Sequence, residues 1–102
     1  MLRLPLQKKW WLMIYNGQKH EEYREIGPYW GKRFRTIGLL DDKGEPVKGA
    51  TADVILQNGF REKAPQIQAR VTLKIRGGEE KWGAEKGKKY YVLSILTWER
   101  VR

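Results

Sequence analysis

The stretch that decides the fold is "QIQARVTLKIR", residues 66–76. Apolar and polar side chains alternate along it, which is the period of a β-strand with one face on a core. The polar side chains are Gln66, Gln68, Arg70, Thr72, Lys74 and Arg76. The apolar side chains, which we predict to be buried, are Ile67, Ala69, Val71, Leu73 and Ile75.

Four other segments are also predicted to be strands. "LRLPL" (2–6) alternates, and Pro5 confines it to the edge of a sheet or to a strand end. "KHEEYREI" (19–26) places His20, Glu22 and Arg24 on one face, and Lys19, Glu21 and Tyr23 on the other. "ADVILQ" (52–57) is apolar enough to be buried on both faces at its centre, and "YYVLSILTWERV" (90–101) is apolar on both faces.

One or two short helices are expected near the N-terminus. "KKWWLMIY" (8–15) has helical spacing and is followed by Asn16-Gly17, a pair that ends helices well. In "GPYWGKRF" (27–34), Pro28 suits the first position of a second helix. Because strands dominate and no strand–helix–strand rhythm appears, we predict one mainly β (α+β) domain over 1–102. Its expected form is a small antiparallel barrel or curled sheet of about five to six strands, plugged by a helix.

Composition excludes several classes of protein. With 102 residues, 40% of them apolar, the chain has enough for one modest core. It has no cysteine and one histidine, so disulfides, zinc knuckles and thiol catalysis are excluded, and neither a metal nor a cofactor is expected. No apolar run is long enough for a membrane span, and nothing reads as a signal peptide. A cytoplasmic location without membrane attachment is the simplest expectation.

The charge is strongly basic and uneven. The net charge is +9, made up of +5 in residues 1–36, −2 in 37–60 and +6 in 61–102. Clustered lysine and arginine release counterions when they meet phosphates, so a polyanionic partner is indicated. The alternative is a highly charged surface that only keeps the protein in solution.

Aromatic and basic residues lie together in two places, as in modules that bind single-stranded RNA. There, bases stack on aromatic rings while cations hold phosphates, although core packing is the more common role of aromatic side chains such as these. The first group is Tyr29, Trp30, Lys32, Arg33 and Arg35. The second is the turn around Phe60, with Asn58 and Arg61.

"NGQKHEEYR" (16–24) carries the most specific pattern. Gly17, Lys19, Glu22 and Arg24 match the G-x-K-x-x-E-x-R signature, and the chain here resembles the ASCH domain family, especially its short bacterial and phage members. "VILQNGF" and "WGAEKGKKYYVLSI" also resemble later segments of that group. The resemblance implies a PUA-like β-barrel with a charged cleft near the signature. It also implies binding of single-stranded RNA or a nucleotide-like ligand.

The same resemblance keeps an enzymatic alternative open. Some family members are amidohydrolases acting on N4-acetylcytidine, and another cleaves RNA. The signature lysine is catalytic in the amidohydrolases, and Lys19 matches it. A threonine nucleophile stands there three residues later, where this chain has Glu22. Glu22 is a poor replacement for a hydroxyl nucleophile, although a carboxylate can act as a base for water.

The sequence therefore leaves three functional hypotheses open. The first is an RNA-binding module with a cleft built from Lys19, Glu22, Arg24 and the Tyr29–Arg35 segment. The second is a small hydrolase of RNA or modified nucleosides that uses Lys19 and Glu22. The third is a small-ligand sensor or phage accessory protein in which these charges form a structural ion-pair network and the basic surface is incidental.

Overall fold

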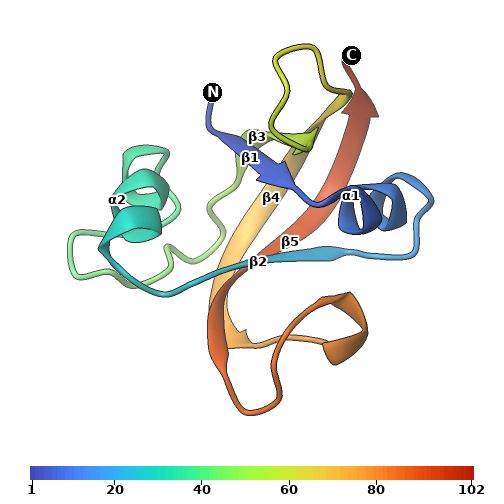
Figure 1. Cartoon of the computed structure of the whole chain (residues 1–102). Coiled ribbons are helices and arrows are strands. Elements are labelled where there is room, and N and C mark those ends of the chain that lie inside the picture. Colours follow the sequence, from blue (N-terminus) through green and yellow to red (C-terminus); the bar gives the residue numbers. More distant parts are fainter.

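The computed structural model describes residues 1–102 as five strands and two helices (Figure 1). The elements are β1 (Arg3–Leu6), α1 (Lys8–Tyr15), β2 (Glu21–Arg24), α2 (Pro28–Thr36), β3 (Ala52–Asn58), β4 (Gln66–Gly77) and β5 (Lys89–Arg100). A short 3-10 helix, η1, covers Glu80–Trp82 in the loop between β4 and β5. Neither α-helix is long and apolar enough to cross a membrane.

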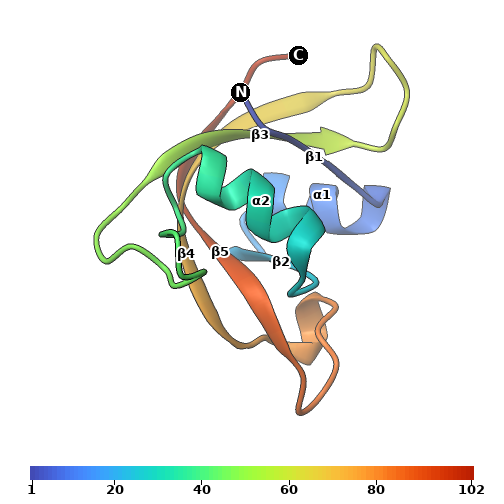
Figure 2. The same ribbon diagram turned by 90° about the vertical axis from the view of Figure 1, so that its left-hand side faces the viewer.

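The five strands form one sheet in the order β1-β3-β4-β5-β2. Figure 2 shows the sheet curling around both helices, so that they lie on its concave side. The predicted class, a small mainly β barrel-like fold with two short helices, is confirmed. One detail differs from an all-antiparallel barrel, because β1 pairs in parallel with β3. A parallel pairing requires a crossover, and the chain supplies one through α1, β2 and α2.

The core lies between the helices and the concave face of the sheet. Ile67, Ala69, Val71 and Leu73 of β4 are all buried, as the alternation predicts, but the prediction is wrong for Ile75, which is 36% exposed near the end of the strand. Helix α1 contributes Trp11 and Ile14, and α2 contributes Phe34. The Trp11 indole N–H also donates to the backbone oxygen of Leu56 (2.9 Å), which fixes α1 against β3.

The expectation that β5 is buried on both faces is correct only for its first half. Residues 90–93 are buried, whereas Leu96 is 52% exposed. The physical reason is the short partner strand, since β2 pairs with residues 91–94 of β5 and no further. The register with β4 also shifts at Arg70/Val71, opposite Leu96, and such a bulge bends the sheet.

Candidate functional site

A cleft of about 480 Å³ opens between the two edge strands of the sheet. Strands β1 and β2 lie at opposite ends of the strand order, so the half-barrel is open between them. Pro5 and Leu6 line one side of this opening, and residues 22–25 line the other. We call it the edge cleft. Six aromatic side chains form much of its wall: Trp10, Tyr23, Trp30, Phe60, Trp82 and Tyr90.

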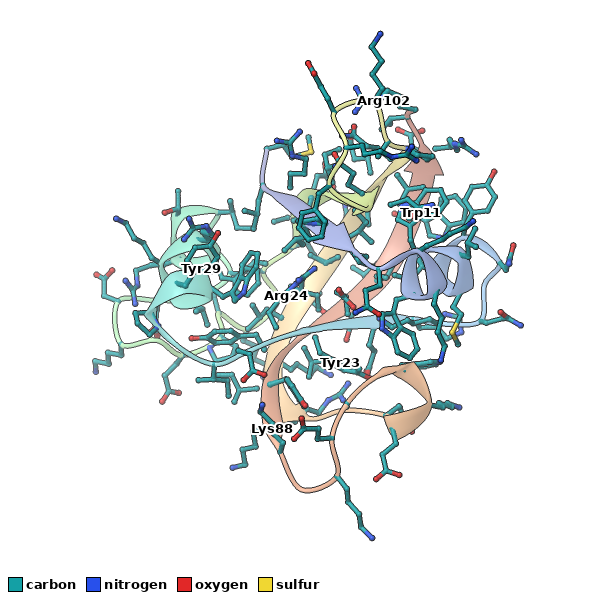
Figure 3. The ribbon with its side chains drawn as sticks, viewed as in Figure 1. Trp11, Tyr23, Arg24, Tyr29, Lys88 and Arg102 are labelled. Carbon is teal, nitrogen blue, oxygen red and sulfur yellow. The ribbon has the colours of Figure 1, made fainter.

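Arg24 spans the opening. Its Nη2 donates to the backbone oxygen of Pro5 (2.9 Å), which joins β2 to β1 where no strand pairing exists. The ring of Trp30 lies 5.0 Å from the guanidinium carbon. Figure 3 shows Arg24 between the two helices, while Tyr29 lies out on α2. The guanidinium is thus held by a strand on one side and an aromatic ring on the other.

Glu22 links Arg24 to Lys19 in a buried chain of three charges. The Lys19 ammonium lies 2.5 Å from Glu22 Oε1, and Arg24 Nη2 lies 3.0 Å from Glu22 Oε2. The exposed fractions of the three side chains are 0% for Lys19, 9% for Glu22 and 17% for Arg24. Two cations and one anion give this chain of charges one net positive charge, while the carboxylates of Glu25 and Glu85 also line the cleft.

Lys19 lies behind the cleft wall rather than in the wall. Its ammonium is 5.4 Å from the Trp10 ring centroid and 5.6 Å from that of Tyr23, and both rings face the cleft. Burial lowers the pKa of Lys19 below its usual range, and the attraction of Glu22 opposes that shift. A ligand in the cleft therefore meets Glu22 and the aromatic rings before it can meet the lysine.

The position of Lys19 also corrects one prediction. Period two placed Lys19 and Glu22 on opposite faces of a strand beginning at residue 19. The strand begins at Glu21 instead, and the Lys19 amide donates to the Met13 oxygen in the turn that ends α1. Lys19 therefore precedes β2, so the alternation of the strand does not set the direction of its side chain, which lies against Glu22.

The third wall of the cleft comes from the loop between β4 and β5. The Trp82 indole N–H donates to the backbone oxygen of Gln18 (2.9 Å). The Tyr23 hydroxyl donates to Glu21 (2.8 Å) and accepts the amide hydrogen of Glu79 (2.9 Å). These bonds hold the loop against β2, so Trp82 faces the cleft from a fixed position.

Glu21 lies on the other face of β2 and is separate from the cleft. Its carboxylate forms an ion pair with Arg76 of β4. Burial by itself raises the pKa of Glu21, but hydrogen bonds from Arg76 and Tyr23 outweigh it and hold that pKa below its usual range. This pair ties the edge strand and the loop to the sheet.

Of the aromatic and basic residues predicted on 29–35, only Trp30 lines the cleft. The segment is the helix that Pro28 indicates, so its side chains point in different directions. Tyr29 is 59% exposed and carries Arg33 over its ring at 3.5 Å. Lys32 and Arg33 line a separate groove beside Met1 and Leu2, and Arg35 donates to the Asp41 oxygen.

The second predicted group contributes one side chain to the cleft. Phe60 lines it, whereas its neighbours Asn58 and Arg61 do not. Asn58 is the last residue of β3, and its backbone N–H donates to the backbone oxygen of Pro65. Arg61 is exposed. The structure thus brings together Glu22, Arg24, Trp30 and Phe60, with Lys19 directly behind them.

Sequence reasoning missed Trp10, Tyr23 and Tyr90 as cleft residues. Helical spacing puts Trp10 on one face with Met13 and Ile14 and predicts a core role for it, but Trp11 occupies the core instead. A usable signal was present, because neighbouring residues on a helix point about 100° apart and two adjacent tryptophans do not share one direction. No pattern in the sequence marks Tyr23 or Tyr90.

The chemistry of the cleft is that of aromatic rings and an ion-pair chain. No serine or threonine lines it. No three His, Asp or Glu side chains come together as a possible metal site. Comparison of the chain with protein-family models, with curated proteins and with solved structures gives no match.

Proposed function

We propose that the protein is a binding module of the ASCH type for single-stranded RNA, and that one nucleobase enters the edge cleft. The observation that carries this proposal is the set of six aromatic side chains around the cleft. Bases that are not paired stack on aromatic side chains, and such stacking supplies much of the affinity for single strands. A cleft of about 480 Å³ lies in the size range of small-ligand sites.

The floor of the cleft supports recognition of a base edge. Arg24 Nε is buried and has no hydrogen-bond partner in the protein. A buried donor left without an acceptor is unfavourable, so an acceptor on a ligand would stabilise it. Glu22 lines the same cleft and has carboxylate lone pairs to accept from a base amino group. One donor and one acceptor side by side suit the hydrogen-bonding edge of a base.

The phosphates would lie outside the cleft. Helix α2 brings Trp30 to the cleft and places Lys32 and Arg33 in the separate groove beside Met1 and Leu2. Lys32 is exposed and forms no ion pair. Cations on the same helix as Trp30 can contact the phosphates of an RNA strand whose base stacks on that ring. Their contribution to the affinity falls as the salt concentration rises.

A hydrolase that uses Lys19 and Glu22 has less support. The Lys19 side chain is fully buried behind the wall and is paired with Glu22. The lowered pKa of Lys19 is its one favourable feature. Without a serine or threonine nucleophile in the cleft, binding accounts for the geometry better than turnover.

The test is the affinity for a labelled single-stranded RNA decamer across a salt series, with double-stranded DNA as the competing polyanion. We expect selective binding of the RNA that persists near physiological salt. Trp30→Ala should weaken it by about 5- to 150-fold, the equivalent of one stacked base. The matched control is Trp98→Ala, because Trp98 lies outside the edge cleft. Equal affinity for both polymers and no difference between the two variants would refute the proposal.

A further inference from the structure

A second hollow adjoins the edge cleft and shares part of its wall. It has a volume of about 290 Å³ and is lined by Arg3, Pro5, Gln57, Phe60 and Glu62. Pro5 and Phe60 line the edge cleft as well. The two hollows therefore lie on either side of these two residues. We call the second one the Arg3 hollow.

Phe60 is the most exposed of the large apolar side chains, at 84%. It extends from the turn between β3 and β4, where Gly59 has φ +89° and supplies the left-handed backbone that the turn needs. A fully exposed phenyl ring between two hollows offers a face to each. Nothing within the chain covers it, so the position gives no packing benefit to the fold.

The turn that carries Phe60 is held in place by a buried amide. Gln57 is 3% exposed, and its Nε2 donates to the Gly59 oxygen (2.9 Å) and the Arg61 oxygen (3.2 Å). These two carbonyls flank Phe60 in the chain. Gln57 Oε1 accepts in turn from Gln66 Nε2 (2.7 Å), so both the nitrogen and the oxygen of the Gln57 side-chain amide are hydrogen-bonded. The ring is thus presented from an ordered backbone, which lowers the entropy cost of binding.

The two charged residues of the Arg3 hollow are both without partners in the chain. Arg3 is exposed and forms neither an ion pair nor a side-chain hydrogen bond, and the Glu62 carboxylate forms none either. A guanidinium suits a phosphate oxygen or a base edge, and a carboxylate accepts from a base amino group. Because the hollow holds one charge of each sign, it fits a nucleotide better than a phosphate alone.

We propose that the ligand continues from the edge cleft across Phe60 into the Arg3 hollow, so that the protein binds at least two consecutive nucleotides. One base lies in the edge cleft, the next stacks on the outer face of Phe60, and Arg3 contacts the phosphate between them. This inference rests on the proposed function and narrows it. The ligand class is a strand, and a free nucleoside or mononucleotide fills only half of the site.

The test compares AMP, CMP and UMP with the tetranucleotides rA4, rC4 and rU4 by calorimetric titration of the full chain. We expect at least one tetranucleotide to bind about tenfold or more tightly than its own monophosphate. Arg3→Ala should remove most of that gain. The matched control is Lys63→Ala, which loses the same charge from the neighbouring turn but lines neither hollow.

The possible outcomes separate a failure of the second subsite from a failure of the proposed function. Equal affinity for a tetranucleotide and its monophosphate would refute the second subsite, while the binding of one base in the cleft would stand. A gain that Arg3→Ala and Lys63→Ala reduce equally would also refute it, because the strand would then leave the cleft elsewhere. Failure of every probe to bind would refute the proposed function itself.

Discussion

Replacing Glu22 by glutamine should strongly destabilise this protein. Glu22 is the only anion in contact with both Lys19 and Arg24, at 2.5 and 3.0 Å. Glutamine has the same shape but no charge. The variant therefore keeps the packing and leaves two buried cations without a counter-charge.

The size of the effect follows from burial. Removing one partner of a buried ion pair costs about 3–5 kcal/mol, because an uncompensated charge remains. The Lys19 side chain has no exposed surface, so its part of that cost is not screened by solvent. For a domain near this size, such a loss lowers the melting temperature by about 12 to 40 °C. That is a large share of the roughly 5–15 kcal/mol that stabilises a typical domain.

The pH dependence gives a second signature. Burial lowers the pKa of Lys19 from its ordinary value of 10.5, so between the lowered pKa and 10.5 the unfolded chain binds more protons than the folded one. The free energy of unfolding then rises with pH across that window. Without Glu22 the attraction that opposes the shift is lost. The window therefore begins at a lower pH, and the variant should regain stability as Lys19 loses its proton.

The assay is urea unfolding of the wild type and of Glu22→Gln at several values from about pH 6 to about pH 10. Lys19→Met serves as the partner variant, and the double variant Lys19→Met/Glu22→Gln closes a double-mutant cycle. We expect the double variant to be more stable than Glu22→Gln alone. A loss below about 1 kcal/mol for Glu22→Gln, with no added pH dependence, would show that the three charges are not a buried chain.

Three further variants test the surroundings of the site. Arg76 and Tyr23 hold the pKa of Glu21 below its ordinary value of 4.5, so the stability that Glu21 gives the fold is lost as the pH falls through that lowered pKa. In acid unfolding, Glu21→Gln should therefore flatten the dependence of stability on pH below about pH 4.5. Gly31→Ala should destabilise the protein by about 1–3 kcal/mol in thermal unfolding, because a Cβ at this position would lie 2.9 Å from the Tyr91 hydroxyl oxygen. Adding Tyr91→Phe to that variant should restore part of the lost stability. Tyr23→Phe should cost about 0.5–1.5 kcal/mol and speed hydrogen exchange of the Glu79 amide, whose acceptor is the Tyr23 hydroxyl; unchanged exchange would contradict that contact.

The sequence was most informative where one period ran undisturbed. The alternation on 66–76 correctly predicts the buried face of β4 as far as Leu73. The Lys8–Tyr15 helix has its expected bounds, because Gly17 takes φ +77° directly after it. Pro5 lies on an edge strand, where its missing amide hydrogen costs nothing.

The candidate site was harder to predict, because it depends on where elements meet in space. The signature residues Glu22 and Arg24 do lie at the cleft, but the aromatic walls come from six separate parts of the chain. The basic side chains of α2 were grouped by their nearness in sequence. A helix turns neighbours in different directions, so Trp30 faces the cleft and Lys32 does not.

The central claim is that a base enters the edge cleft, and the indole N–H resonances test it most directly. The chain has five tryptophans, of which Trp10, Trp30 and Trp82 line the cleft. Trp11 is buried against Leu56, and Trp98 lies on the far half of β5. We expect single-stranded RNA to shift the three cleft resonances and leave the other two in place. Movement of Trp98 alone, or of none of the five, would contradict the account.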